Sequence, residues 1–149
     1  MTFTRVNSIA DYGATVLRVS LGIMYLAHAH LKIFTFTLVG TAEFFAKVGF
    51  PGWMAYPVTF AELTAGAALI IGWNARSVSL ALTPVLIGAA ITHWPNGWVH
   101  VSVGAGWEYP VFLIAASITL GLMGNGAWAL ETRTGRLSIP STSNQRAGI

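Results

Sequence analysis

The sequence predicts an all-α integral membrane protein, folded as an antiparallel four-helix bundle. Of its 149 residues, 54% are hydrophobic and only 9% are charged, and the mean hydropathy is +0.64. Soluble domains carry about 25% charged residues, so a water-exposed globule is disfavoured. Four segments also have the apolar length of about 20 residues that a helix needs to cross a bilayer. Since lipid offers no partners to backbone polar groups, each such segment is expected to be helical.

The first predicted span covers residues 11–34, and Asn7 or Ser8 is a candidate N-cap for its helix. A longer connection follows this span. Within it, Thr41 is a candidate cap for a short amphipathic helix lying at the membrane interface and carrying Phe44.

The other three spans are predicted at residues 54–72, 77–93 and 109–130. Pro84 lies inside the third span and is expected to kink that helix, because proline lacks the N–H that the helix uses. Pro110 lies in the first turn of the fourth span, where a missing N–H has no consequence.

The basic residues predict the orientation of these spans. One side of the predicted membrane domain carries most of the arginines, namely Arg5, Arg76, Arg133, Arg136 and Arg146. The positive-inside rule therefore places this side, with both termini, in the cytoplasm. Residues 1–131 then form one transmembrane domain, and residues 132–149 are expected to be a disordered cytoplasmic tail. An aromatic belt is expected at the outer interface, made by Trp53, Trp94, Trp98, Trp107 and Tyr109.

The composition argues against several classes of site. The chain has no cysteine, which excludes disulfides, iron–sulfur clusters held by cysteine, and c-type haem attachment. The formal charge is +3, but the basic residues form no clustered face of the kind that binds nucleic acid. His28 and His30 are two residues apart and point to different faces of a helix, so we expect no metal site from this pair.

Glu62 carries the strongest functional signal, because it is the only charged residue between positions 54 and 72. An ionisable group at the centre of a membrane helix costs roughly 2.5–3.5 kcal/mol on insertion scales, and such groups usually mark a functional site. The alternative is a protonated carboxyl that only bonds a neighbouring helix. We favour the functional interpretation.

The first span offers partners for this carboxyl. Arg18, Tyr25 and Lys32 repeat every seven residues, and His28 lies between the last two. At about 100° per residue these side chains share one face of the helix. Arg18 lies deepest, and it is a candidate ion-pair partner for Glu62 if both face the axis of the bundle.

Two more ionisable groups come from other spans. His93 ends the third span and Glu108 opens the fourth, both on the outer side. Together with the groups named above, they predict a polar site in the outer half of the bundle. Simpler roles remain open for some of them. Lys32 and His93 can snorkel to lipid headgroups, and Glu108 can favour the positive end of its helix.

Several segments in this order resemble the DoxX family of small bacterial membrane proteins. The resemblance covers residues 17–131 and rests on RVSLGIMYLAHAHLKIF, GFP, AELTAGAALIIGWNAR, His93, WEYPVF and GNGAWALE. The chain departs from the common family pattern at Ala29, where glycine is usual, and at Ala129 and Glu131, where serine and aspartate are usual.

The resemblance implies a four-helix bundle in the bacterial cytoplasmic (inner) membrane and a link to quinone-dependent oxidation, including thiosulfate:quinone oxidoreduction. A quinone is then the expected cofactor. A quinone needs an apolar slot, hydrogen-bond donors at its carbonyls and a route for protons. We expect catalytic roles for Glu62, His28, His93 and Glu108, and ligand-binding roles for Lys32, Arg18, Tyr25 and Arg76.

Two other functions remain open. The short chain and its lack of cofactor motifs also fit a non-catalytic accessory or assembly subunit of a larger membrane complex. A small-solute transporter is the third alternative, and it is disfavoured because the sequence shows no inverted repeat. None of the residues present transfers electrons by itself, so an oxidoreductase role requires a second substrate or redox partner. We therefore expect membrane lipid as surroundings and either a homo-oligomer or a larger complex.

Overall fold

The computed structural model describes residues 8–99 and 104–130. Every regular element in these ranges is a helix, which confirms the all-α prediction. The predicted tail at 132–149 and the candidate cap Asn7 lie outside the described residues. The elements are α1 (Ile9–His30), the π-helix η1 (Leu31–Thr35), α2 (Leu38–Lys47), the 3₁₀ turn η2 (Gly52–Met54), α3 (Ala55–Ile71), α4 (Ala75–Ala81), α5 (Thr83–His93), the 3₁₀ turn η3 (Trp94–Asn96) and α6 (Glu108–Met123).

Two segments of the described chain, Gly52–Ile71 and Ala75–Asn96, are by themselves long and apolar enough to cross a membrane. A third qualifies if Ile9–Thr35 is counted together with α2, although the two are bent by 101°. The apolar helix α6 is shorter, so the predicted fourth span at 109–130 extends too far. Gly124, with φ of 90°, ends that helix, because left-handed backbone interrupts the helical hydrogen bonds.

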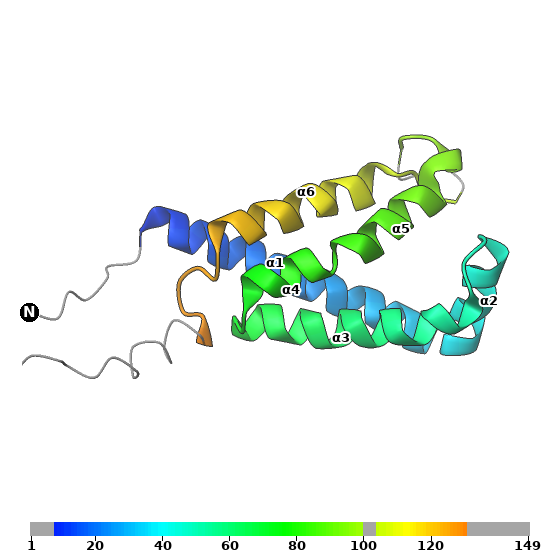
Figure 1. Cartoon of the computed structure of the whole chain (residues 1–149), viewed down its shortest axis with the longest axis horizontal. Coiled ribbons are helices and arrows are strands. Elements are labelled where there is room, and N and C mark those ends of the chain that lie inside the picture. Colours follow the sequence, from blue (N-terminus) through cyan, green and yellow to red (C-terminus); the bar gives the residue numbers. More distant parts are fainter. Residues whose placement is uncertain (1–7, 100–103, 131–149) are drawn as a thin grey trace, which may run out of the picture.

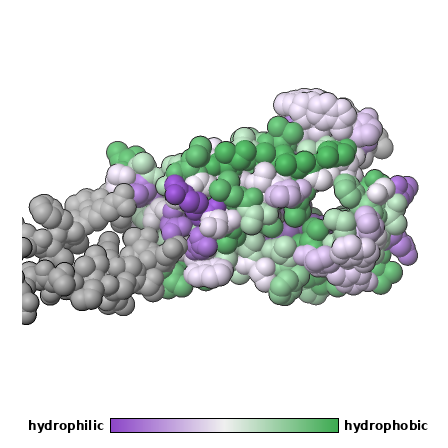
Figure 2. Space-filling view, viewed as in Figure 1, coloured by the Kyte–Doolittle hydropathy of each residue, from purple (hydrophilic) through white to green (hydrophobic). Residues whose placement is uncertain are grey.

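The helices lie lengthwise beside one another, as Figure 1 shows for α1, α3, α6 and the α4–α5 pair. Helix α1 packs on α3 and α6, and α6 also packs on α4 and α5. Helix α2 lies across the end of the molecule where α1 ends and α3 begins. Figure 2 shows an extensive hydrophobic surface along the body of the molecule. Large apolar side chains such as Phe60, Phe112 and Leu122 are exposed, as expected for helices that face lipid.

Helices α1 and α2 begin at side-chain caps. Ser8 caps α1: its hydroxyl accepts from the Asp11 backbone N–H at 3.2 Å, and the Asp11 carboxylate accepts from the Ser8 N–H at 2.8 Å. The predicted cap of the interfacial helix is wrong by one turn. Thr37, not Thr41, caps α2 by accepting from the Gly40 N–H, because the backbone leaves the helical region at Thr37. Thr41 lies inside the helix and donates to the Thr37 carbonyl instead.

The proline predictions agree with the structure. The third predicted span is interrupted between α4, which ends at Ala81, and α5, which begins at Thr83. Pro84 lies in the first turn of α5 and cannot donate to the preceding turn, which explains the interruption. Upstream, Gly72 ends α3 in a left-handed conformation, and α4 begins at Ala75, slightly earlier than predicted.

Helices α1 and α3 approach each other closely at two glycines. A Cβ added to Gly22 would lie 2.8 Å from the carbonyl oxygen of Gly66, and a Cβ added to Gly66 would lie 2.9 Å from the carbonyl oxygen of Gly22. Only glycine permits backbones this close, which is the usual role of small residues between membrane helices. The crossing holds the last turns of α1 against α3, and this brings Lys32 within reach of Glu62.

Candidate functional site

A cavity of about 370 Å³ lies at the end of the molecule that carries α2. Its walls come from α1, α3, α5 and α6, with α2 and the residues after it on one side. Figure 2 shows an opening in the molecular surface at this end. The volume of the cavity falls in the range of small-molecule sites, which are mostly apolar with a few polar groups at defined positions. The polar side chains in its wall are Tyr25, His28, Lys32, Glu62, Thr92, His93 and Tyr109.

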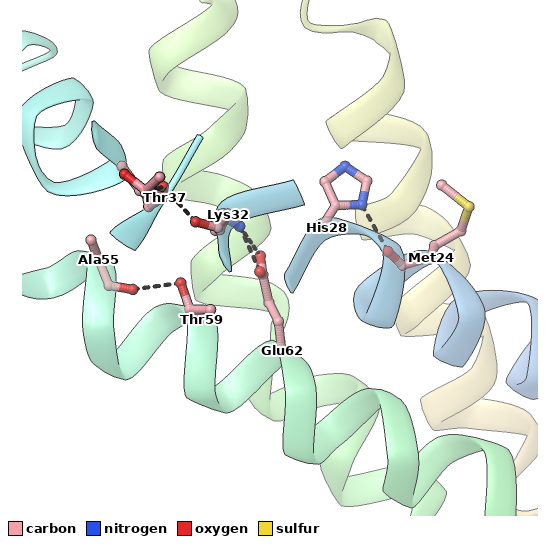
Figure 3. A network of polar contacts seen from close by, with 8 residues as sticks. Met24, His28, Lys32, Thr37, Ala55, Thr59 and Glu62 are labelled. Atoms are coloured by element: carbon pink, nitrogen blue, oxygen red, sulfur yellow. Dashed lines mark hydrogen bonds and ion pairs between the residues drawn. The ribbon is translucent and has the colours of Figure 1, made fainter. Parts of the chain in front are cut away.

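An ion pair between α3 and the end of α1 forms the charged part of this wall. The Lys32 ammonium donates to both carboxylate oxygens of Glu62, with Nζ–Oε1 and Nζ–Oε2 distances of 2.6 and 2.5 Å (Figure 3). The side chains are only 17% and 6% exposed, respectively. The candidate pairing of Arg18 with Glu62 does not occur, because Arg18 donates to backbone carbonyls near the end of α3 instead. Shielded from water, the pair is held by strong charge-assisted bonds.

The backbone around Lys32 is widened into the π-helix η1. The Phe36 N–H donates to the Leu31 carbonyl at 2.9 Å, a bond that spans five residues where an α-helix spans four. The Thr41 hydroxyl from α2 donates to the Lys32 carbonyl at 3.3 Å. Turns of this kind occur frequently at functional sites. Here the turn places the lysine beside Glu62 and links it to the helix that borders the cavity.

Two histidines from different elements line the same cavity. Nδ1 of His28 lies 2.8 Å from the Met24 carbonyl oxygen, and the ring stacks on Tyr109 with a centroid distance of 5.9 Å. Nδ1 of His93 lies 3.0 Å from the Gly104 carbonyl oxygen in the segment that leads to α6. Each ring is therefore oriented by a backbone carbonyl through one of its nitrogens.

Tyr25 and Tyr109 complete the polar wall. The Tyr25 hydroxyl lies 3.1 Å from the Ser117 hydroxyl on α6, and both side chains are buried. The sequence analysis assigned Tyr109 only to the interfacial belt, yet its side chain lines the cavity. Tyr109, Leu113 and Ser117 follow one another every four residues, so they share the inner face of α6. This spacing is the sequence signal that could have identified Tyr109 as a residue of the site.

Three predicted site residues are not brought into the cavity wall. Glu108 begins α6 but is not among the lining residues. Arg18, only 2% exposed, donates to the carbonyls of Leu69 and Ile70 at 2.7 and 2.9 Å. Arg76 donates to the carbonyls of Gly121 and Leu122 at 2.7 and 3.1 Å. The two arginines thus bind backbone carbonyls at the C-terminal ends of α3 and α6.

The end of the molecule around Arg18 is closed by the segment that follows α6. Ala127 and Ala129 are fully buried there, and the Ala127 N–H donates to the Asp11 carbonyl at 3.0 Å. The Thr15 hydroxyl donates to the Ala127 carbonyl at 2.8 Å. None of these residues lines the cavity, which lies toward the α2 end.

Comparisons with known proteins agree on one family. The DoxX family model matches residues 13–95, which is more than half of the chain and includes the ion pair and both cavity histidines. A protein of Bacillus subtilis (strain 168) named "Putative oxidoreductase CatD" is 32% identical over 129 residues, covering 84% of this chain and 89% of that protein. No solved structure matches. The chain belongs to the DoxX family of membrane proteins.

Proposed function

We propose that this protein is the quinone-binding component of a membrane oxidoreductase system, built as an antiparallel four-helix bundle. The Lys32–Glu62 ion pair in the wall of an otherwise apolar cavity carries the proposal. A buried charged pair inside a membrane protein is costly, and such pairs usually mark ligand or proton pathways. The name of the relative from Bacillus subtilis, which includes the word oxidoreductase, supports the same class of activity.

The cavity residues fit a quinone ring. The ring is flat and apolar apart from two carbonyl oxygens, and the wall offers apolar side chains such as Leu86, Leu113 and Phe50. The Lys32 ammonium has three N–H donors, and two bonds go to Glu62, which leaves one donor for a ligand oxygen. The volume of about 370 Å³ suits the head group, and a long tail would extend through the opening into lipid.

A bound quinone supplies two-electron chemistry, in which uptake of two electrons and two protons gives the quinol. In this proposal Glu62 and Lys32 hold and pass these protons, and the apolar wall limits the access of water. The electrons must come from, or go to, a second substrate or protein, because no side chain here carries them. The working unit therefore includes either a second substrate or a redox partner.

The proposed location is the bacterial cytoplasmic membrane with both termini inside. Arg18 and Arg76 lie at the end where α3 and α6 finish, and Lys32 lies at the α2 end. In the sequence, Arg5 precedes α1, and Arg133 follows the segment that comes after α6. The positive-inside rule then places the cavity in the outer half of the bilayer.

Native purification followed by mass spectrometry of the lipid extract tests this function. We expect about one quinone per chain in the wild-type protein and a loss of most of it in Gly88→Leu, which adds bulk to the cavity wall. The matched control is Ala67→Leu, whose added bulk lies on the exposed face of α3. Wild-type protein free of quinone, tightly bound to another membrane chain, would instead identify an accessory subunit.

A further inference from the structure

The two cavity histidines present a defined hydrogen-bonding face to a ligand. Nδ1 of His28 is bonded to the Met24 carbonyl, and Nδ1 of His93 to the Gly104 carbonyl. A carbonyl oxygen only accepts, so the proton of each neutral ring lies on Nδ1 and the lone pair lies on Nε2. Both rings therefore offer an acceptor, rather than a donor, at their second nitrogen.

These second nitrogens are available to a ligand. Within the described ranges 8–99 and 104–130, neither Nε2 has a hydrogen-bond partner, while both side chains line the cavity. Figure 3 shows the free nitrogen of His28 on the edge of the ring opposite the bond to Met24. The Lys32 ammonium in the wall bonds a carbonyl oxygen or a hydroxyl oxygen equally well. The hydroxyls of Tyr25, Thr92 and Tyr109 each donate or accept, so they favour neither redox form.

We infer that the site distinguishes the two redox forms of its ligand and binds the quinol more tightly than the quinone. This inference rests on the proposed function and adds which redox form of the ligand the site prefers. Each quinol hydroxyl can donate to an Nε2 acceptor of His28 or His93. A quinone carbonyl facing the same nitrogen pairs two acceptors, and polar atoms left unpaired in an apolar cavity are unfavourable.

Calorimetric titration of the purified full-length protein measures this preference. Decylubiquinol and decylubiquinone are compared without oxygen at pH 8. We expect the quinol to bind at least ten-fold more tightly. The preference is the dissociation constant of the quinone divided by that of the quinol. Each of His28→Phe and His93→Phe should lower this ratio about five-fold, the change expected for one net hydrogen bond.

Two further variants separate hydrogen bonding from loss of structure. His28→Gln retains a carbonyl acceptor and should keep more of the preference than His28→Phe. His30→Phe is the matched control, because His30 lies on the same helix, is exposed, and does not line the cavity. Its ratio of dissociation constants should equal that of the wild type.

Each remaining outcome overturns a stated claim. Equal or tighter binding of the quinone by the wild type overturns the inference and leaves the proposed function in place. A quinol preference unchanged in both phenylalanine variants also overturns it, because the histidines would not be its source. Failure of both ligands to bind overturns the proposed function together with the inference.

Discussion

Lys32 and Glu62 illustrate how much depends on single residues inside a membrane. The carboxylate is 6% exposed and takes both of its bonds from one ammonium group. A buried ion pair adds little stability compared with apolar residues of the same size. Removal of one partner is costly, however, because the other charge is left uncompensated.

The pair should therefore behave non-additively in a double-mutant cycle. We expect Lys32→Met and Glu62→Leu each to lower the free energy of unfolding by about 3 kcal/mol, while the double variant recovers most of that loss. Titration with SDS, followed by circular dichroism, measures these values. Losses that simply add in the double variant would show that the two side chains do not stabilise each other.

The residues of the site were only partly predictable from the sequence. The placement of Tyr25, His28 and Lys32 on one cavity wall follows from helical periodicity, and the sequence predicted it. The partner of Arg18 could not be predicted in the same way, because helical periodicity does not show which turn of the neighbouring helix lies beside a residue. Arg18 lies level with the last turn of α3 and donates to the carbonyls of Leu69 and Ile70 there instead of to Glu62.

At the scale of elements, the close crossing of α1 and α3 positions the ion pair. Its two glycines were not singled out from the sequence, because small residues are common in membrane helices and only the packed structure shows which ones touch.

The end of α6 was missed for a related reason. The segment after Gly124 looks apolar enough to continue the helix, but it docks on α1 through Thr15 and Ala127. The interruption at Pro84 was predictable, since it depends on local backbone chemistry alone.

Substitution at this crossing should be more damaging than the same change elsewhere. In Gly66→Ala the new Cβ would lie 2.9 Å from the carbonyl oxygen of Gly22, so the helices must separate. We expect a loss of about 1–3 kcal/mol in the free energy of unfolding.

The matched control for this change is Gly88→Ala, another helical glycine. Its added Cβ would meet nothing closer than 3.9 Å, and alanine favours helix, so its stability should stay the same or rise. The same SDS titration compares the two variants. Equal stability of both would contradict a close contact at the crossing.

At the scale of the whole molecule, the absence of cysteine makes the orientation directly measurable. Single cysteines at exposed positions, Ala46→Cys in α2 and Ser77→Cys in α4, report on the two ends of the molecule. In spheroplasts, a membrane-impermeant maleimide should label Ala46→Cys at once, and Ser77→Cys only after permeabilisation, because the positive-inside rule places the Arg76 end inside. The reverse pattern would invert the proposed orientation.

The closed end around Arg18 has a consequence for energy conversion. Within the described ranges 8–99 and 104–130, the buried guanidinium and the docked Ala127 segment lie between the cavity and this end, and no lining residue comes from it. In the proposed orientation, protons released from a quinol at Glu62 would therefore enter the outer aqueous phase and not the cytoplasm. Oxidation of quinol at this site would acidify the outside of the cell, and reduction of quinone would make it more alkaline.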